Sequence, residues 1–239
     1  MKLKTNLHFH SSEDPLDSIT YSLFEGIDKA KSHNFDVLAS TLHNKCGATE
    51  EHIAYAKSKN LLLISGIEKD IYTNHQDKNH VVILNCDKDA EKIHDFDDLR
   101  SYKANNPEIF ILAPHPYMYG SFSLHDNLTK YIDIFDAIEH SWFYTKWFDR
   151  NQKAEQVAKE HKKPFVCTSD THFFDFMDDH YTTIEADEVT PKACFEAIQN
   201  HNHENTTRER SLYDIFVTFG INHTKMEMRK ILRRLKTSK

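Results

Sequence analysis

The stretch Asn6-Leu7-His8-Phe9-His10-Ser11-Ser12-Glu13-Asp14 closes the first apolar segment of the chain. We predict a strand over residues 2–9, and side chains two positions apart on a strand point to the same face. His8 and His10 could therefore offer two imidazoles to one metal ion, and Asp14 on the following loop could add a carboxylate. Because the chain holds 17 histidines, a single His-x-His pair is weak evidence, and the positions of other candidate ligands must decide.

Length and composition limit the class of protein. The chain has 239 residues and a net charge of -7, enough for one large α/β domain or two small ones. Its cysteines, Cys46, Cys86, Cys167 and Cys194, lie far apart without a C-x-x-C pair, which favours reduced thiols in a cytoplasmic protein. We see no signal peptide, no membrane-spanning apolar run and no glycine-rich phosphate loop, and we expect neither a membrane protein nor a P-loop or dinucleotide fold.

Apolar segments alternate with segments of helical periodicity along most of the chain. Strands are predicted at residues 2–9, 35–41, 61–67, 81–84, 109–113, 134–138, 164–167 and 181–184. Helices are predicted at residues 18–34, 49–60, 90–104, 124–131, 145–161 and 190–200. This alternation predicts right-handed βαβ units and a parallel sheet, and about seven repeats predict closure into a barrel. In such barrels the active site forms at the carboxyl ends of the strands.

Candidate metal ligands follow one predicted strand after another. They stand in Leu42-His43-Asn44, Gly66-Ile67-Glu68, Ala113-Pro114-His115-Pro116 and Ser169-Asp170-Thr171-His172. His80 is the exception, because it precedes its apolar run. Since the carboxyl ends of barrel strands meet on one side, this agreement in position is the strongest sequence evidence for a single site.

In this order the motifs resemble the polymerase and histidinol phosphatase (PHP) family of metal-dependent phosphoesterases, from about residue 3 to about residue 185. The resemblance implies an α/β fold, a distorted (β/α)7 barrel of PHP type that holds up to three metal ions. It assigns His8, His10, Glu68 and Asp170 to the first metal, Glu68 as a bridge with His80 and His115 to the second, and Asp14, His43 and His172 to the third. Glu13 or Asp17 could replace Asp14, which we prefer because its offset from His10 is the commonest in the family.

Imidazole and carboxylate ligands suit Mn²⁺, Fe²⁺ or Zn²⁺, and no cysteine belongs to this set. A carboxylate that bridges two metals holds them about 3.5–4 Å apart, so that both can act on one phosphoryl group. We find no credible protein nucleophile, and we expect metal-activated water to attack the phosphorus. The motifs thus predict a hydrolase of phosphate esters with two or three divalent metals.

Other residues near the motifs could contribute. Glu139 ends a strand and could support a ligand, and His140 beside it could contact substrate. Lys45 and Lys69 directly follow ligands and could hold a phosphate, although we favour solvated positions for both. The remaining histidines, including His180, are expected in surface or packing positions. The aromatic residues from Trp142 to Phe148 are expected to pack as core or lid.

The last part of the chain differs in charge from the rest. Residues 204–239 hold nine Lys/Arg and four Asp/Glu, a net +5, which leaves -12 for residues 1–203. We therefore divide the chain into a PHP metal-dependent hydrolase domain at 1–203 and a basic helical C-terminal extension at 204–239. The extension is expected to pack on the barrel with a solvated basic end, and a contact with nucleic acid or substrate phosphate is the alternative.

Three functions remain open at this point. The leading hypothesis is a cytoplasmic phosphoesterase that hydrolyses a small phosphate monoester. An exonuclease or phosphodiesterase acting on short oligonucleotides is the second, although the acidic barrel would repel polyanions except near its metals. The third is a non-catalytic metal-binding module, which the complete ligand set disfavours.

Overall fold

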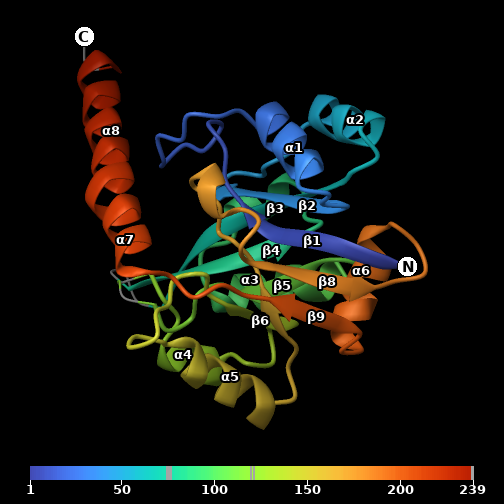
Figure 1. The fold of residues 1–239 in the computed structure, drawn as a ribbon. Helices are drawn as coiled ribbons and strands as arrows, with labels where there is room; N and C mark the ends of the chain where they lie inside the picture. Colours follow the sequence, from blue (N-terminus) through green and yellow to red (C-terminus); the bar gives the residue numbers. More distant parts are fainter. Residues whose placement is uncertain (74–76, 119, 121, 238–239) are drawn as a thin grey trace.

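A computed structural model describes residues 1–73, 77–118, 120 and 122–237 of the chain. Nine strands form one sheet in the order β7-β6-β5-β4-β3-β2-β1-β8-β9, and the sheet curls into a nearly closed barrel (Figure 1). The strands are β1 (Lys2–Phe9), β2 (Val37–His43), β3 (Leu62–Tyr72), β4 (Lys78–Leu84), β5 (Phe110–Ala113), β6 (Ala137–His140), β7 (Phe165–Cys167), β8 (Tyr181–Glu185) and β9 (His203–Thr206). The α/β barrel with a C-terminal helical extension is thereby confirmed.

Helices cover the outside of this barrel and one end of it (Figure 1). They are α1 (Leu23–Ser32), α2 (Glu50–Ser58), α3 (Phe96–Asn105), α4 (Asp126–Lys130), α5 (Asn151–Glu160) and α6 (Pro191–Gln199), with short 3-10 turns η1 (Lys88–Lys92) and η2 (Phe174–Phe176). One core cluster takes a side chain from each of β1 to β8 and packs on Phe195 and Ile198 of α6. The other two clusters lie between the strands and the outer helices.

The prediction of an entirely parallel sheet is wrong for β8, which pairs antiparallel with β1 and β9, and it is wrong for β4. This strand pairs antiparallel with both β3 and β5, so it runs against its neighbours. Its first residues therefore lie at the same edge as the carboxyl ends of the parallel strands. In this register His80 stands opposite Asp70 of β3, which explains why His80 precedes its apolar run and still belongs with the other candidate ligands.

Helix starts follow their capping residues more closely than their apolar periodicity. The helix predicted from residue 18 begins at Leu23, because the Ser22 hydroxyl accepts a hydrogen bond from the Glu25 amide and the Glu25 carboxylate accepts one from the Ser22 amide. The helix predicted from residue 145 begins only at Asn151. The preceding residues form a tight turn in which the amides of Thr145 and Phe148 donate to each other's carbonyls.

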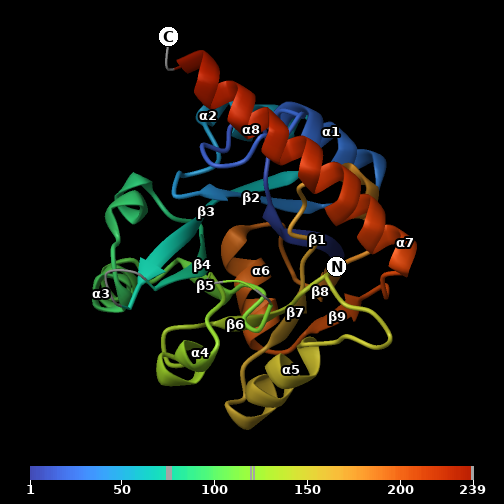
Figure 2. The same cartoon turned by 90° about the vertical axis from the view of Figure 1, so that its left-hand side faces the viewer.

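The helices at the C-terminal end of the chain begin at Leu212. The predicted boundary at residues 203 and 204 falls inside β9, which pairs antiparallel with β8. Beyond β9 come α7 (Leu212–Ile215), the wide helical segment η3 (Phe216–His223) and α8 (Thr224–Thr237). In Figure 2, α8 crosses in front of the end of the barrel beside α1 and α2. Among the described residues, no helix is long and apolar enough to cross a membrane.

Candidate metal centre

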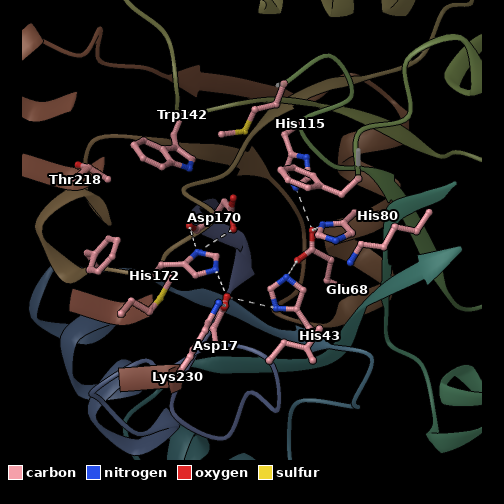
Figure 3. A pocket seen from close by; sticks show the side chains of 16 residues that line it. Asp17, His43, Glu68, His80, His115, Trp142, Asp170, His172, Thr218 and Lys230 are labelled. Carbon is pink, nitrogen blue, oxygen red and sulfur yellow. Dashed lines mark hydrogen bonds and ion pairs between the residues drawn. The ribbon is translucent and has the colours of Figure 1, made fainter. Parts of the chain in front are cut away.

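A cavity of about 350 Å³ opens at the edge where the parallel strands end and β4 begins (Figure 3). Six predicted metal ligands line it. They are His43, Glu68, His80, His115, Asp170 and His172. The structure thus brings together residues that lie up to 129 positions apart, and β2, β3, β4 and the loops after β5 and β7 supply them. His8 and His10, at the end of β1, lie fully buried behind this layer.

Glu68 occupies the middle of the cluster, and its two oxygens face different histidines. Oε1 lies 2.8 Å from His80 Nδ1 and 3.1 Å from His115 Nε2. Oε2 lies 3.1 Å from His43 Nε2, 3.3 Å from His10 Nε2 and 3.4 Å from His8 Nε2. One carboxylate therefore faces the histidines assigned to the second metal through Oε1, and those assigned to the first and third metals through Oε2.

Asp170, in the loop after β7, lies close to His8 and His10. Its Oδ1 lies 3.5 Å from Nε2 of His8 and 3.5 Å from Nε2 of His10, and the two Nε2 atoms are 3.1 Å apart. Three residues that the resemblance assigns to the first metal thus converge with Glu68 on one point. The backbone φ of Asp170 is +41°, in the left-handed region that residues other than glycine seldom adopt.

The third group involves Asp17 as well as Asp14. His172 Nε2 lies 2.8 Å from Asp17 Oδ2, and His43 Nδ1 lies 2.9 Å from Asp14 Oδ2 and 3.7 Å from Asp17 Oδ2. Asp17 lines the cavity, whereas Asp14 is nearly completely buried behind it. Glu13 points elsewhere, because its carboxylate accepts from the Leu23 amide at the start of α1.

Carboxylates outside the centre orient several of the imidazoles. Glu139 Oε2 is 3.1 Å from His8 Nδ1, and Asp14 Oδ2 is 3.0 Å from His10 Nδ1, so each ring turns Nε2 inward. Asp70 Oδ1 lies 3.2 Å from His80 Nε2, which leaves Nδ1 of that ring facing Glu68. Such outer hydrogen bonds fix the tautomer and orientation of metal-binding histidines. Sequence reasoning missed Asp70, although its position two residues after Glu68 on β3 places it on the same face.

The electrostatics of the cluster are dominated by burial and by the close approach of opposite charges. Burial alone would lower the pKa of His8, but Asp170, Glu68 and Glu139 raise it well above its ordinary value. Burial and His172 likewise lower the pKa of His10, yet hydrogen bonds to Asp14, Asp170 and Glu68 raise it to about 10. Burial also opposes the rise in the pKa of His80, which Glu68 and Asp70 bring to about 9.

The pKa values of the carboxylates shift in the opposite direction. Burial tends to raise the pKa of Glu68, and His80, His8 and His43 more than offset this, so it falls well below its ordinary value. The pKa of Asp170 is lowered in the same way by His8 and His172 against its burial. The protein alone therefore stabilises this cluster as charged carboxylates among protonated imidazoles.

Several ligand atoms remain without a hydrogen bond of good geometry among the described residues. They include Asp170 Oδ1 and His80 Nδ1, both buried, whereas His80 Nε2 faces Asp70 Oδ1. An unsatisfied buried polar atom costs about 1–3 kcal/mol, and divalent cations bound on either side of Glu68 would satisfy these two atoms. The donor set of imidazoles and carboxylates, together with these unpaired atoms, fits a divalent metal centre.

Other predicted contacts lie away from the cavity. Lys45 donates to the Glu13 carbonyl at 3.2 Å, and Lys69 donates to Asn44 Oδ1 at 3.2 Å; neither lines the cavity. His140 lies on the opposite face of β6 from Glu139. Two lysines that sequence reasoning did not select do line it, Lys78 at the start of β4 and Lys230 on α8.

The C-terminal extension supplies one wall of the cavity. Thr218 of η3 and Met226 and Lys230 of α8 face the histidines, and Trp142 closes the same side (Figure 3). Lys230 Nζ lies 2.6 Å from Asp17 Oδ1 and 2.8 Å from Glu227 Oε1. Periodicity indicated a helix here but not its contact partner, so no local signal identified this wall.

Comparison with known proteins places this geometry in context. A family model described as PHP-associated matches residues 148–202. The chain also superposes on a two-domain protein from Bacteroides vulgatus that contains a predicted PHP-like metal-dependent phosphoesterase, with 18% identity, a TM-score of 0.65 and 87% of this chain covered. The chain has the fold of the PHP family. The resemblance that the motifs indicated is confirmed.

Two further structures share the fold. PsfC from Pseudomonas syringae aligns with 14% identity and a TM-score of 0.59, covering 94% of this chain and 98% of its own. The lesion-specific endonuclease EndoQ from Pyrococcus furiosus aligns with 12% identity and a TM-score of 0.60, covering 86% of this chain and 58% of its own. The chain spans about 65% of the length of the Bacteroides vulgatus protein. No curated protein sequence matches it at a significant level.

Proposed function

We propose that this chain is a metal-dependent phosphoesterase that hydrolyses a small phosphate monoester. The proposal depends on the position of Glu68, because its two carboxylate oxygens face two separate groups of buried histidines. The likeness to proteins described as PHP-like metal-dependent phosphoesterases supports it.

In this proposal two or three divalent ions, Mn²⁺, Fe²⁺ or Zn²⁺, occupy the cluster. His8, His10, Glu68 and Asp170 would hold one ion, and Glu68, His80 and His115 a second. His43 and His172 would hold a third together with a carboxylate. We propose Asp17 for that position, because its Oδ2 faces the cavity and His172 Nε2, whereas Asp14 already accepts from His10 and from the His43 amide.

Bound metals of this kind generate a nucleophile from water near neutral pH and offset the charge of a phosphoryl group. The chain itself positions the ligands and selects the substrate. Glu139, Asp14 and Asp70 hold the imidazoles in one orientation each. Phe122 stacks on the His80 ring with a centroid distance of 4.9 Å and shields the centre from bulk water on that side.

The cavity suits a small substrate with one charged end. Its volume of about 350 Å³ lies at the lower end of ordinary ligand pockets. Lys78 and Lys230 add two positive charges at its rim, and Met118, Trp142 and Met226 provide apolar surface. We propose that the lysines contact the phosphate of the substrate and that the apolar wall contacts its organic part.

A nuclease is the second candidate, and one observation favours it. Lys225, Arg229 and Lys230 lie along α8 beside the cavity and a neighbouring hollow, where a nucleic-acid backbone could follow them. EndoQ, which has this fold, has been crystallised with a duplex that carries an abasic lesion at its active site. The charge of -12 on residues 1–203 opposes a long polyanion, so the monoester remains our first choice.

The test begins with protein purified without added metal. Elemental analysis should find two to three divalent ions per chain, and the same sample should hydrolyse an aryl phosphate in a chelator-sensitive reaction. Asp170→Asn should abolish turnover while the far-ultraviolet spectrum stays that of a folded barrel, and Asp187→Asn, an exposed carboxylate far from the cavity, should change nothing. A protein that binds no metal and stays inactive after addition of Mn²⁺ or Zn²⁺ would sink the proposal.

A further inference from the structure

A second group of possible metal ligands lies on the outer face of the barrel. Glu139 and His140 are consecutive on β6 and therefore point to opposite faces of the sheet. The register pairs His140 with Cys167 and Glu139 with Val166 of β7. Val166 belongs to the core cluster inside the barrel, whereas Ile138, on the face of His140, belongs to the cluster outside. His140 and Cys167 thus share the outer face, away from the cluster around Glu68.

His180 completes this group from the turn that leads into β8. Its ring centroid lies 5.4 Å from that of His140. One ligand atom each from His140, Cys167 and His180 lies within 4.8 Å of the other two. Cys167 and His180 have no exposed surface, and His140 is half-buried. Three soft or borderline ligands therefore meet at a point that the mechanism proposed above does not use.

Two nitrogens in this group lack a partner. His140 Nδ1 and His180 Nε2 are buried and make no hydrogen bond with any of the described residues. The loss of a hydrogen bond at a buried polar atom costs about 1–3 kcal/mol, so two such atoms side by side call for an explanation. A cation that accepts both lone pairs would remove the cost.

We propose that His140, Cys167 and His180 bind one zinc ion at a site separate from the cavity. Thiolate and imidazole are the ligands that zinc prefers in proteins. Ligand atoms of a tetrahedral zinc ion lie roughly 3.3–3.6 Å apart, given zinc distances of about 2.3 Å to sulfur and 2.0–2.1 Å to nitrogen. The three ligand atoms lie within 4.8 Å of one another, so side-chain movements of about 1 Å would bring them to this spacing.

The protonation states of the two histidines suit such a site. Burial lowers the pKa of His140, and burial together with His140 and Arg210 lowers the pKa of His180 to about 2, so both rings stay neutral. Burial raises the pKa of the Cys167 thiol, and Glu139 adds to this. Zinc would therefore bind two ready ligands and displace one thiol proton.

One existing contact competes with the ion. The Arg208 amide donates to His180 Nδ1 over 3.4 Å, which places the ring proton on Nε2 in the absence of metal. This bond is long for an N–H···N contact. Moving the proton to Nδ1 would lose one weak bond and free Nε2 for the metal.

The position of the group indicates what the ion would do. The hydrogen-bonded sheet has its edges at β7 and β9, and no backbone ladder among the described residues pairs β7 with β8. Thr182 Oγ1 bridges this seam by accepting from the Cys167 amide at 2.8 Å and donating to the Cys167 carbonyl at 3.0 Å. Zinc on Cys167, His140 and His180 would join β6, β7 and the start of β8 across the same seam and stabilise it.

Cobalt substitution tests this site separately from the phosphoesterase centre. The ligands proposed around Glu68 include no cysteine, so a thiolate-to-cobalt charge-transfer band in the full chain would report only on a cysteine site. Cys46 is the control, because its Sγ lies 3.9 Å from Cys86 Sγ and could also bind cobalt. We expect the band in the wild type, in Cys46→Ser and in Glu68→Gln, and its loss in Cys167→Ser and in His180→Gln.

Cys167→Ser and His180→Gln should also each bind one zinc ion fewer per chain. Their melting temperatures should be lower than that of the wild type. No thiolate band in the cobalt-loaded wild type would overturn the proposal. A band that survives Cys167→Ser and disappears in Cys46→Ser would also overturn it, by moving the site to the other cysteines. Because Glu68→Gln keeps this band under the proposal, failure of the phosphoesterase function leaves the test intact.

Discussion

The cavity has two walls of different origin. The barrel wall consists of His43, Glu68, His80 and His115 on strand ends and the loop after β5, almost fully buried and held by hydrogen bonds to further carboxylates. The extension wall consists of Thr218, Met226 and Lys230 on η3 and α8. The same extension exposes large apolar side chains, with Tyr213 at 74% and Phe216 at 63% of their surface.

This difference separates two tasks. A strand end fixes a side chain by backbone ladders on both sides, and so the barrel wall can hold ligands in one geometry. A helix that packs through few buried residues can change its sequence without disturbing the barrel. We therefore expect the barrel wall to determine the chemistry and the extension wall to determine which substrate enters.

The largest effect should follow a change at Glu68. In Glu68→Gln the two histidine groups would lose their shared negative charge, and we expect kcat for an aryl phosphate to fall on the order of 10³-fold. Steady-state kinetics with added Mn²⁺ measures it, with Glu188→Gln as an exposed control that keeps full activity. If Glu68→Gln retained more than about a tenth of kcat, the bridging role would be wrong.

A smaller effect is expected from the carboxylates behind the ligands. Glu139→Gln should keep the fold but weaken the hold on His8 Nδ1, and metal affinity should fall about 10–100-fold. Metal titration by calorimetry measures this, and kcat at saturating metal should recover. Recovery of kcat would identify Glu139 as a residue that positions His8. A kcat that stays low at saturating metal would show that Glu139 itself contacts the metal or the substrate.

Much of the barrel wall could be predicted because strand ends are visible in sequence. His43, Glu68, His115 and Asp170 each follow an apolar run, and parallel strands bring such positions together. His80 did not fit this pattern. The direction of its strand, β4, depends on the chain reversing after β3, and apolar periodicity does not encode that reversal. The choice between Asp14 and Asp17 was open for a related reason, since only the loop geometry shows which carboxylate faces the cavity.

The extension wall could not be predicted from the same information. Helical periodicity over residues 224–237 indicates a helix but not the surface on which it lies. Lys230 meets Asp17 across more than two hundred residues of chain, through tertiary packing alone. The pairing of His140 and Cys167 with His180 was missed for the same reason, because no motif spacing joins them.

The extension wall should respond to substitution mainly through substrate binding. Lys230→Met would remove a positive charge from the cavity rim, and we expect KM for the phosphorylated substrate to rise roughly tenfold, the value of one charge-assisted hydrogen bond. The matched control is Lys225→Met, which loses the same charge from an exposed position on the same helix. An equal effect in both variants would indicate general charge attraction, and a salt-dependent loss of oligonucleotide binding in both would favour the nuclease.

The smallest effect should be a pH dependence confined to the barrel wall. The pKa values of His80 and His10 are raised from 6.5 to about 9 and about 10, so in chelated protein their protonated forms stabilise the fold fully below 6.5. This contribution is lost as the pH rises through about 9 and about 10, and the melting temperature of chelated protein should fall across that window.

Metal-loaded protein should lack this fall, because its imidazoles are already neutral ligands. Calorimetric scans of chelated and loaded samples at stepped pH values measure the difference. Two parallel curves would contradict a cluster that exchanges protons for metal. If the melting temperature of chelated His10→Gln and His80→Gln still fell over this pH range, the pH dependence would come from groups outside the centre. The barrel wall would then not differ from the extension wall in its pH dependence.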